Sequence, residues 1–244
     1  MNAILDIKGL RKQFGGVTAL SGIDLAIYEG EILGVVGPNG SGKTTLFNVV
    51  TGVHKPTAGS VTWRGRDITG IPAHEISRTG IGYTFQQAMA FAGLPVIENV
   101  RIAMEHARRP KHAVNGAFSW PTPESLLDFV GIRPLANEMA GVLPFGNLRL
   151  LGLALALASR PTLLLLDEPA AGLNDRETAA LVRLVEQFPS HGISVCVIDH
   201  DMKLMQMLCK RLAVLDFGSK IADGPTNDVL HDPKVLEVYL GGEV

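Results

Sequence analysis

The chain has 244 residues, of which 19% are charged and 46% are apolar, and its formal net charge at pH 7 is -2. This composition is typical of a globular protein, and the length allows one large domain or two smaller ones. The small negative charge argues against a general nucleic-acid-binding protein, which would need a basic surface. The two cysteines, Cys196 and Cys209, are too few for a disulfide framework and indicate a reducing compartment.

The first part of the chain contains three short runs in which apolar and polar residues alternate, at residues 4–8, 22–28 and 60–64. Such alternation predicts an antiparallel sheet with one buried face. Residues 31–36 form a short apolar run of strand character, and apolar residues recur at helical spacing over residues 46–50. The segment between these two is therefore a loop that joins a buried strand to a helix.

This loop carries the complete pattern G-x-x-x-x-G-K-[ST], in Gly37, Pro38, Asn39, Gly40, Ser41, Gly42, Lys43, Thr44 and Thr45. A strand before the pattern and a helix after it are the context that a phosphate-binding loop requires. The glycines let successive backbone N–H groups turn toward phosphates, and the helix N-terminus adds partial positive charge. We expect Lys43 to reach the β- and γ-phosphates and the Thr44 hydroxyl to bind Mg²⁺, so the chain binds a nucleoside triphosphate.

The rest of the chain alternates strand-like and helical patterns. Apolar runs of strand character lie near residues 81–85, 162–166, 193–198 and 212–215. Between residues 87 and 141, helical stretches at 96–108 and 124–130 are separated by links rich in Pro, Gly, Asn and Ser. The alternation predicts a mainly parallel sheet with helices on both faces, into which a helical segment is inserted.

A leucine-rich stretch at residues 150–166 could suggest a membrane span. Arg160 and Pro161 divide it into two pieces, each too short to cross a hydrocarbon core. We expect a buried helix over residues 148–158 followed by a buried strand, and no crossing of the membrane by the chain itself.

These elements predict an α/β protein of the P-loop NTPase class, with a mainly parallel sheet, an antiparallel β subdomain and an inserted helical subdomain. We expect one domain over residues 1–244. Residues 1–86 and 159–244 would form its core, including the antiparallel part, and residues 87–158 its helical subdomain.

Two adjacent acids, Asp167 and Glu168, follow the predicted strand at 162–166. Ligands of open α/β sheets bind at the carboxyl ends of the strands, so Asp167 can hold Mg²⁺ there. Glu168, on the other side of the pleat, can orient and deprotonate a water molecule. Adjacent acids at a strand end are usually solvated turn residues, and the phosphate loop is what favours the catalytic interpretation.

Three further residues are candidates for the same site. His200 follows the strand at 193–198, which we expect beside the strand carrying Asp167, and its imidazole could sense the γ-phosphate. A structural role is the usual one for a lone histidine. Gln86 ends the strand at 81–85 and could touch Mg²⁺ or the attacking water, although alone it is a weak signal. Phe14 could stack on an adenine ring or be an ordinary core residue.

In the order phosphate loop, Gln, short glycine motif, Asp-Glu, His, the chain resembles the ATP-binding subunits of ABC transporters over essentially its whole length. Stretches at residues 11–20 (RKQFGGVTAL), 84–87 (TFQQ), 167–174 (DEPAAGLN), 200–205 (HDMKLM) and 239–241 (YLG) are similar to the branched-chain amino-acid (LIV-type) importers.

The resemblance implies a RecA-like core and an ATP-driven dimer docked beneath membrane permease subunits, at the cytoplasmic face of the inner (plasma) membrane. It implies adenine stacking by Phe14, metal binding by Thr44, Gln86 and Asp167, catalysis by Lys43, Gln86, Glu168 and His200, and contact with the partner subunit through residues 171–174. ATP and Mg²⁺ would be the cofactors. A solute-binding protein would be an indirect partner, and nucleic acid would not be a partner.

The segment that should complete the partner's ATP site departs from the family pattern Leu-Ser-Gly-Gly-Gln. It reads Leu143, Pro144, Phe145, Gly146 and Asn147. Pro144 has neither the serine hydroxyl nor a backbone N–H, while Gly146 could still let the backbone approach a phosphate. The helix that follows, over residues 148–155, has leucine where family members commonly carry Arg or Glu. Losing one charge-assisted contact costs about 1.5–3 kcal/mol, a ten- to hundredfold slower step. We therefore expect a heterodimer with two unequal ATP sites.

The preferred function is ATP hydrolysis that drives import of amino acids, of branched-chain type, or of similar small polar solutes such as short amides or urea. A soluble regulatory or repair ATPase would usually carry two cassettes or a nucleic-acid surface. A degenerate subunit that binds ATP but hardly hydrolyses it stays open for the site completed by Pro144 and Phe145. A kinase would need an acceptor site that the sequence does not reveal.

Overall fold

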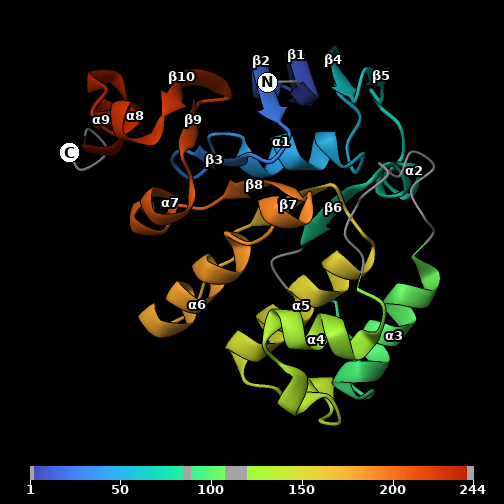
Figure 1. The fold of residues 1–244 in the computed structure, drawn as a ribbon. Helices are drawn as coiled ribbons and strands as arrows, with labels where there is room; N and C mark the ends of the chain where they lie inside the picture. Colours follow the sequence, from blue (N-terminus) through green and yellow to red (C-terminus); the bar gives the residue numbers. More distant parts are fainter. Residues whose placement is uncertain (1–2, 85–88, 108–119, 241–244) are drawn as a thin grey trace.

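The structure, a computed structural model, describes residues 3–84, 89–107 and 120–240 (Figure 1). Within these ranges the strands form a four-stranded sheet and a six-stranded sheet. The two sheets are the expected antiparallel and mainly parallel parts.

The four-stranded sheet is antiparallel, in the order β2-β1-β4-β5. Its strands are β1 (Ala3–Phe14), β2 (Val17–Tyr28), β4 (Ala58–Trp63) and β5 (Arg66–Asp67). The first two strands are longer than the runs predicted at residues 4–8 and 22–28. Their pairing shifts register at several places, and each shift interrupts the two-residue alternation by which a strand is recognised in sequence.

The six-stranded sheet has the order β10-β9-β3-β8-β7-β6. Its strands are β3 (Ile32–Val36), β6 (Ile81–Thr84), β7 (Leu163–Asp167), β8 (Ser194–Ile198), β9 (Arg211–Asp216) and β10 (Ser219–Pro225). All pairs are parallel except β9 with β10. The sequence interpretation missed β10, which is an edge strand of mixed polarity. The turn before it has Phe217 and Gly218 at φ 39° and 77°, the geometry of a tight hairpin.

Alternate residues of the buried strands face two separate cores. In β7, Leu163 and Leu165 pack on the side of the antiparallel sheet, and Leu164 and Leu166 pack on the opposite side. The helix α1 (Lys43–Val50) lies between the two sheets (Figure 1) and contributes its buried face to the first core. Because Asp167 has the same parity as Leu165, its side chain lies on the α1 side.

The remaining helices are α2 (Ala73–Ile76), α3 (Val96–His106), α4 (Pro123–Val130), α5 (Phe145–Ala158), α6 (Asp175–Val185), α7 (Met202–Leu208), α8 (Thr226–Leu230) and α9 (Pro233–Leu240). Helices α3, α4 and α5 pack against one another below the six-stranded sheet in Figure 1. The division into a core and a helical subdomain at residues 87 and 158 stays a prediction. Among the described helices, none combines the length and apolar character needed to cross a bilayer.

Helix α5 begins three residues before the predicted start at residue 148. Pro144 occupies the N-cap position with an extended backbone, φ -54° and ψ 151°, and the helix continues from Phe145. Gly146 and Asn147 are poor helix formers, which is why the sequence pattern placed the start after them. The segment expected to complete a partner's site therefore lies in the first turn of a helix.

Candidate nucleotide site

The phosphate loop is held tightly between β9 and β2. A Cβ atom on Gly37 would lie 2.1 Å from the Leu215 carbonyl oxygen, and one on Gly42 would lie 2.6 Å from that of Ala19. Gly42 also has φ 105°, a conformation that L side chains rarely adopt. These two positions therefore accept only glycine, which is the physical reason for their place in the pattern.

Lys43 is folded back onto its own loop. Its Nζ donates hydrogen bonds to the carbonyl oxygens of Gly37 at 2.7 Å and of Pro38 at 2.8 Å. Burial lowers the pKa of Lys43, and the carboxylates of Glu168 and Asp167 oppose that shift. The charges of both acids therefore act on the ammonium group of Lys43.

Asp167 ends β7, and its two carboxylate oxygens differ in their contacts with the described part of the chain. The Tyr83 hydroxyl donates to Oδ2 at 2.9 Å, and Oδ1 is buried without a hydrogen-bond partner among the described residues. Burial raises the pKa of Asp167, and the hydrogen bond from Tyr83 acts against this. A buried carboxylate oxygen without a donor fits a cation such as Mg²⁺, which prefers oxygen ligands.

Glu168 and His200 come together across neighbouring strands. The backbone N–H of Glu168 donates to the Ile198 carbonyl at 2.8 Å, and Glu168 Oε1 lies 3.6 Å from His200 Nδ1. The expected adjacency of the two strands is confirmed, because β7 and β8 pair in parallel. The pleat does not set the direction of Glu168, since β7 ends at Asp167 and Glu168 has a left-handed backbone with φ 46°.

The sequence interpretation missed two residues of this site. Asp199, only 2% exposed, accepts hydrogen bonds from the N–H groups of His200 at 2.8 Å and Asp201 at 3.0 Å, and so holds the turn on which His200 stands. Its position directly before His200 at a strand end was an available signal. Tyr83 has no such signal, because its contact with Asp167 depends on the pairing of β6 with β7.

Of the two other predicted residues, Phe14 is described by the structure and Gln86 is not. Phe14 ends β1 and is 43% exposed, so the interpretation as an ordinary core residue is wrong. Its ring meets the ring of His54 edge-on at 5.1 Å, and Lys12 Nζ lies 4.6 Å from its centroid. Adenine stacking on Phe14 stays a prediction. Gln86 lies outside the described residues.

The segment Leu143 to Asn147 packs against α6 and the turn before it, within the same chain. A Cβ on Gly146 would lie 2.5 Å from Glu177 Oε1, and one on Gly172 would lie 2.7 Å from the Phe145 ring. The Arg149 guanidinium lies 5.0 Å from the centroid of that ring. In this structure the space that Gly146 leaves open is used by Glu177, an intrachain reason for glycine that the sequence did not suggest.

A complete phosphate loop, an aspartate and a glutamate at the end of β7, and a histidine after the neighbouring strand β8 define a phosphate-loop ATPase. The sheet order, the antiparallel sheet over α1 and the inserted helices place it in the ATP-binding cassette class. Comparison with known families and structures gives the same class.

The family model described as "ABC transporter" matches residues 20–171, and the one described as "Branched-chain amino acid ATP-binding cassette transporter" matches residues 219–244. The chain therefore belongs to the ABC transporter family, in the branched-chain amino acid type. Two similar relatives are named high-affinity branched-chain amino acid transport ATP-binding proteins. They are BraF of Pseudomonas aeruginosa, 37% identical, and LivG of Escherichia coli, 36% identical, each over 98% of both chains.

Similar solved structures are also cassettes of ABC transporters. The ADP conformation of MJ1267, an ATP-binding cassette of an ABC transporter, has a TM-score of 0.86 at 30% identity and covers 99% of this chain. The match extends over 100% of that chain. A dimeric bacterial ABC transporter cassette, MJ0796, has a TM-score of 0.78 at 26% identity over 91% of this chain and 98% of that one. The predicted fold class is thereby confirmed.

Proposed function

We propose that this chain is the ATP-binding subunit of an importer and hydrolyses ATP to drive the uptake of branched-chain amino acids or similar small polar solutes. The observation that carries the proposal is the convergence of Lys43, Asp167, Glu168 and His200 at the carboxyl ends of β7 and β8. The names of BraF and LivG support the solute class, since each is a branched-chain amino acid transport protein.

ATP would bind with its phosphates on backbone N–H groups of the loop at residues 37–45, in which Pro38 has none to offer. Lys43 would leave the carbonyl oxygens of Gly37 and Pro38 and reach the β- and γ-phosphates. Phe14, exposed at the end of β1, would stack on the adenine.

Thr44 and Asp167 would hold Mg²⁺, with Gln86 as a further ligand. When bound, the ion would neutralise negative charge on the β- and γ-phosphate oxygens. The Ser41 hydroxyl is further evidence that the phosphate loop binds a polar ligand, because its Oγ is buried without a hydrogen-bond partner among the described residues.

Glu168 would take a proton from the water that attacks the γ-phosphorus in line. His200 lies 3.6 Å from Glu168 Oε1 and can fix the orientation of this base. Asp199 holds the backbone turn under His200 through two N–H bonds. The hydrolytic step would therefore have a base, a residue that orients the base, and an aspartate that holds the turn of the orienting residue.

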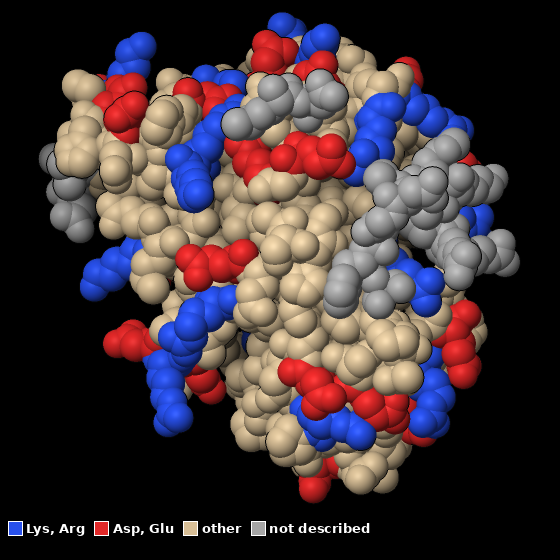
Figure 2. Space-filling model, viewed as in Figure 1, with Lys and Arg blue, Asp and Glu red and all other residues tan. Residues whose placement is uncertain are grey.

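The partners we propose are integral membrane permease subunits, a second ATP-binding subunit in a heterodimer and, indirectly, a solute-binding protein. The chain would then be peripheral, at the cytoplasmic face of the membrane. Nucleic acid is not among these partners. The net charge is -2, and Figure 2 shows basic and acidic side chains interspersed on one face of the molecule.

The test replaces the base. In Glu168→Gln we expect ATP turnover to fall at least a hundredfold while ATP binding persists, because the carboxylate acts on water and not on the bound nucleotide. Phosphate release and fluorescent-nucleotide binding measure the two properties. Glu186→Gln, on the exposed surface after α6, is the matched control and should behave as wild type. Unchanged turnover in Glu168→Gln would place the base elsewhere.

The transport part has a separate test. Cells lacking this chain should lose uptake of labelled leucine and regain it with the wild-type gene but not with Glu168→Gln. Normal leucine uptake in the deletion strain, with loss of another small polar solute, would reassign the solute and leave the ATPase intact.

A second candidate is a subunit that binds ATP but completes a poorly active site on its partner. Pro144 favours it, because the N-cap position of α5 carries no side-chain hydrogen bond and no N–H. Glu168 and His200 argue against it for the site built on the chain's own phosphate loop.

A further inference from the structure

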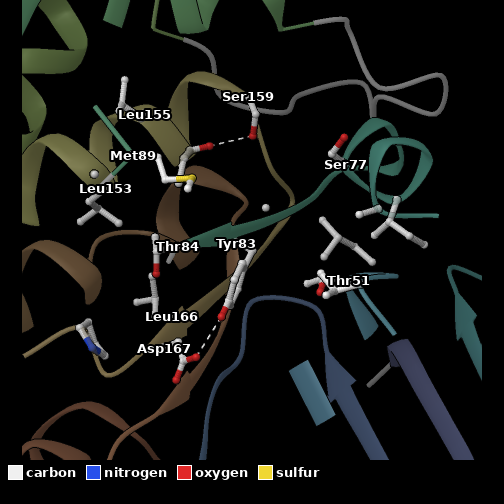
Figure 3. A pocket seen from close by; sticks show the side chains of 18 of the residues that line it. Thr51, Ser77, Tyr83, Thr84, Met89, Leu153, Leu155, Ser159, Leu166 and Asp167 are labelled. Atoms are coloured by element: carbon white, nitrogen blue, oxygen red, sulfur yellow. Dashed lines mark hydrogen bonds between the residues drawn. The ribbon is translucent and has the colours of Figure 1, made fainter. Parts of the chain in front are cut away.

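Tyr83 forms a side-chain hydrogen bond to the carboxylate expected to bind the metal. It lies on β6, and its hydroxyl donates to Asp167 Oδ2 at 2.9 Å, as the dashed line in Figure 3 marks. The other oxygen of the same carboxylate, Oδ1, is buried and has no hydrogen-bond partner in the described part of the chain. Among the described residues, one oxygen of Asp167 thus has a donor and the other has none.

The phenol of Tyr83 is held in place by strand pairing and by ring packing. β6 and β7 pair in parallel with Tyr83 opposite Leu165, so Tyr83 and Asp167 lie on the same face of the sheet. The Tyr83 ring is half-buried and packs edge-on against Phe47, with centroids 6.1 Å apart and planes at 86°. Phe47 belongs to α1, the helix whose first turn carries Thr44. The phenol is therefore fixed relative to both residues expected to bind the metal.

We propose that Tyr83 is a positioning residue for the metal: its hydrogen bond orients the Asp167 carboxylate so that Oδ1 faces the cation shared with Thr44. The inference rests on the proposed magnesium site and adds a residue to it. A hydrogen bond to a ligating carboxylate fixes its rotation, and removing such a support typically lowers metal affinity 10- to 100-fold.

The surroundings supply a matched control. Tyr83 and Asp167 lie on the wall of a cavity of about 360 Å³ that is also lined by Ser159. Ser159 donates its hydroxyl to the Ala156 carbonyl at 2.7 Å, within its own helix end, and not to Asp167. Ser159→Ala removes a hydroxyl from the same cavity without touching the proposed metal ligand.

The experiment measures the affinity of the purified full-length chain for a non-hydrolysable ATP analogue, once with excess Mg²⁺ and once with EDTA. The dissociation constant in EDTA divided by the dissociation constant with Mg²⁺ is a ratio that reports the contribution of the metal independently of turnover. We expect Tyr83→Phe to lower this ratio about tenfold while the affinity in EDTA stays at the wild-type value. Ser159→Ala should change neither, and Tyr83→His, which restores a ring donor, should recover part of the ratio.

The results separate a role of Tyr83 in metal binding from a general structural role, and they test the magnesium site itself. A wild-type ratio in Tyr83→Phe, measured beside an Asp167→Asn variant whose ratio has fallen, overturns the role of Tyr83 and keeps the metal site. An unchanged ratio in Asp167→Asn refutes the magnesium site and the inference with it. Equal loss with Mg²⁺ and with EDTA shows a general structural role and also overturns the inference. Phenylalanine keeps the ring against Phe47, and thermal unfolding checks that each variant is folded.

Discussion

At the scale of single residues, Lys43 makes internal hydrogen bonds that a bound triphosphate would replace. Lys43 is bound by two carbonyl oxygens of its own loop, at 2.7 and 2.8 Å, and lies near the charges of Glu168 and Asp167. A triphosphate offers the ammonium group stronger, charged acceptors than backbone carbonyls. Lys43 can therefore exchange its partners without being left unpaired in a buried site.

Removing this ammonium group should weaken nucleotide binding. We expect Lys43→Ala to raise the dissociation constant for ATP about 10- to 100-fold, the equivalent of one charge-assisted contact of about 1.5–3 kcal/mol. Fluorescent-nucleotide titration measures it. Lys234→Ala, at an exposed position of α9, is the control and should bind as wild type. Equal affinity in Lys43→Ala would mean that the backbone N–H groups alone hold the phosphates.

A second residue-scale prediction concerns pH. Asp223 on β10 pays a desolvation penalty, but its bonds to Arg211 at 2.8 Å and Lys220 at 2.6 Å hold the pKa of its carboxyl below the usual range. A carboxyl whose folded pKa is depressed stabilises the fold above the unfolded pKa, about 3.9, and loses this contribution as pH falls through the folded pKa.

Asp223→Asn should therefore lower the free energy of unfolding at pH 7 by about 1–2 kcal/mol, a value discounted for solvent screening at this edge strand. The difference from wild type should shrink as the pH falls below about 4. Urea unfolding at several pH values measures it. Asp6→Asn, which breaks the exposed pair with Lys8, should cost less than about 0.5 kcal/mol at any pH. A pH-independent loss in Asp223→Asn would point to packing and not to charge.

At the scale of elements, α5 and α6 are joined by a contact between their first turns. Asn174 caps α6 and Glu177 completes the capping box, with Glu177 Oε2 accepting from the Asn174 N–H at 3.0 Å. The same Glu177 side chain fills the space beside Gly146 of α5. Movement of one helix start therefore disturbs the cap of the other, which links the altered Leu143–Asn147 segment to the turn at residues 171–174.

Substitutions at Gly146 and Glu177 should consequently not be additive. Gly146→Ala gains about 0.5–1 kcal/mol of helix propensity but must displace the Glu177 carboxylate, which loses the cap bond. In a Glu177→Ala background only the gain is left. We expect a coupling energy of about 1 kcal/mol in a double-mutant cycle by urea unfolding. Ser190→Ala combined with Gly146→Ala is the additive control, and additivity of the Gly146–Glu177 pair would contradict the contact.

At the scale of the whole molecule, the chain brings most of its proposed ATP-site residues together, while the segment proposed to complete a partner's site is altered. The phosphate loop, Asp167, Glu168 and His200 come together within one chain, while Pro144 and Phe145 occupy positions where the family pattern has Ser and Gly. Helix α5 presents Phe145 half-exposed at its start, with Pro144 as the residue before it. An assembly of two such chains would pair two intact loops with two altered segments, whereas a heterodimer would have unequal sites.

The purified chain alone should therefore hydrolyse ATP slowly, at about a tenth or less of the rate reached when it is mixed with the second ATP-binding subunit of its transporter. Phosphate release over a range of protein concentrations measures both the rate and its cooperativity. Pro144→Ser should raise the rate of the chain alone by up to about tenfold. Robust cooperative hydrolysis by the wild-type chain alone would remove the idea of unequal sites.

Sequence reasoning could name residues that the structure brings together because these residues stand at strand ends. The strands carrying Asp167 and His200 are runs of buried apolar residues, which are recognisable without a structure, and the ends of parallel strands meet at one edge. Strand β10 and the true lengths of β1 and β2 escaped it, because edge strands of mixed polarity and register shifts lack the regular alternation.

The sequence alone determined which residue types the proposed site has: a glycine-rich phosphate loop ending in a lysine and a threonine, and acids and a histidine after buried strands. These are properties of local pattern and spacing. Only the tertiary structure decided which side chains touch. It placed the Tyr83 phenol on Asp167, the Glu177 carboxylate beside Gly146 and Asp199 under His200. The reason is physical, because such contacts depend on which strands and helices lie side by side, and that is set by packing of the whole chain.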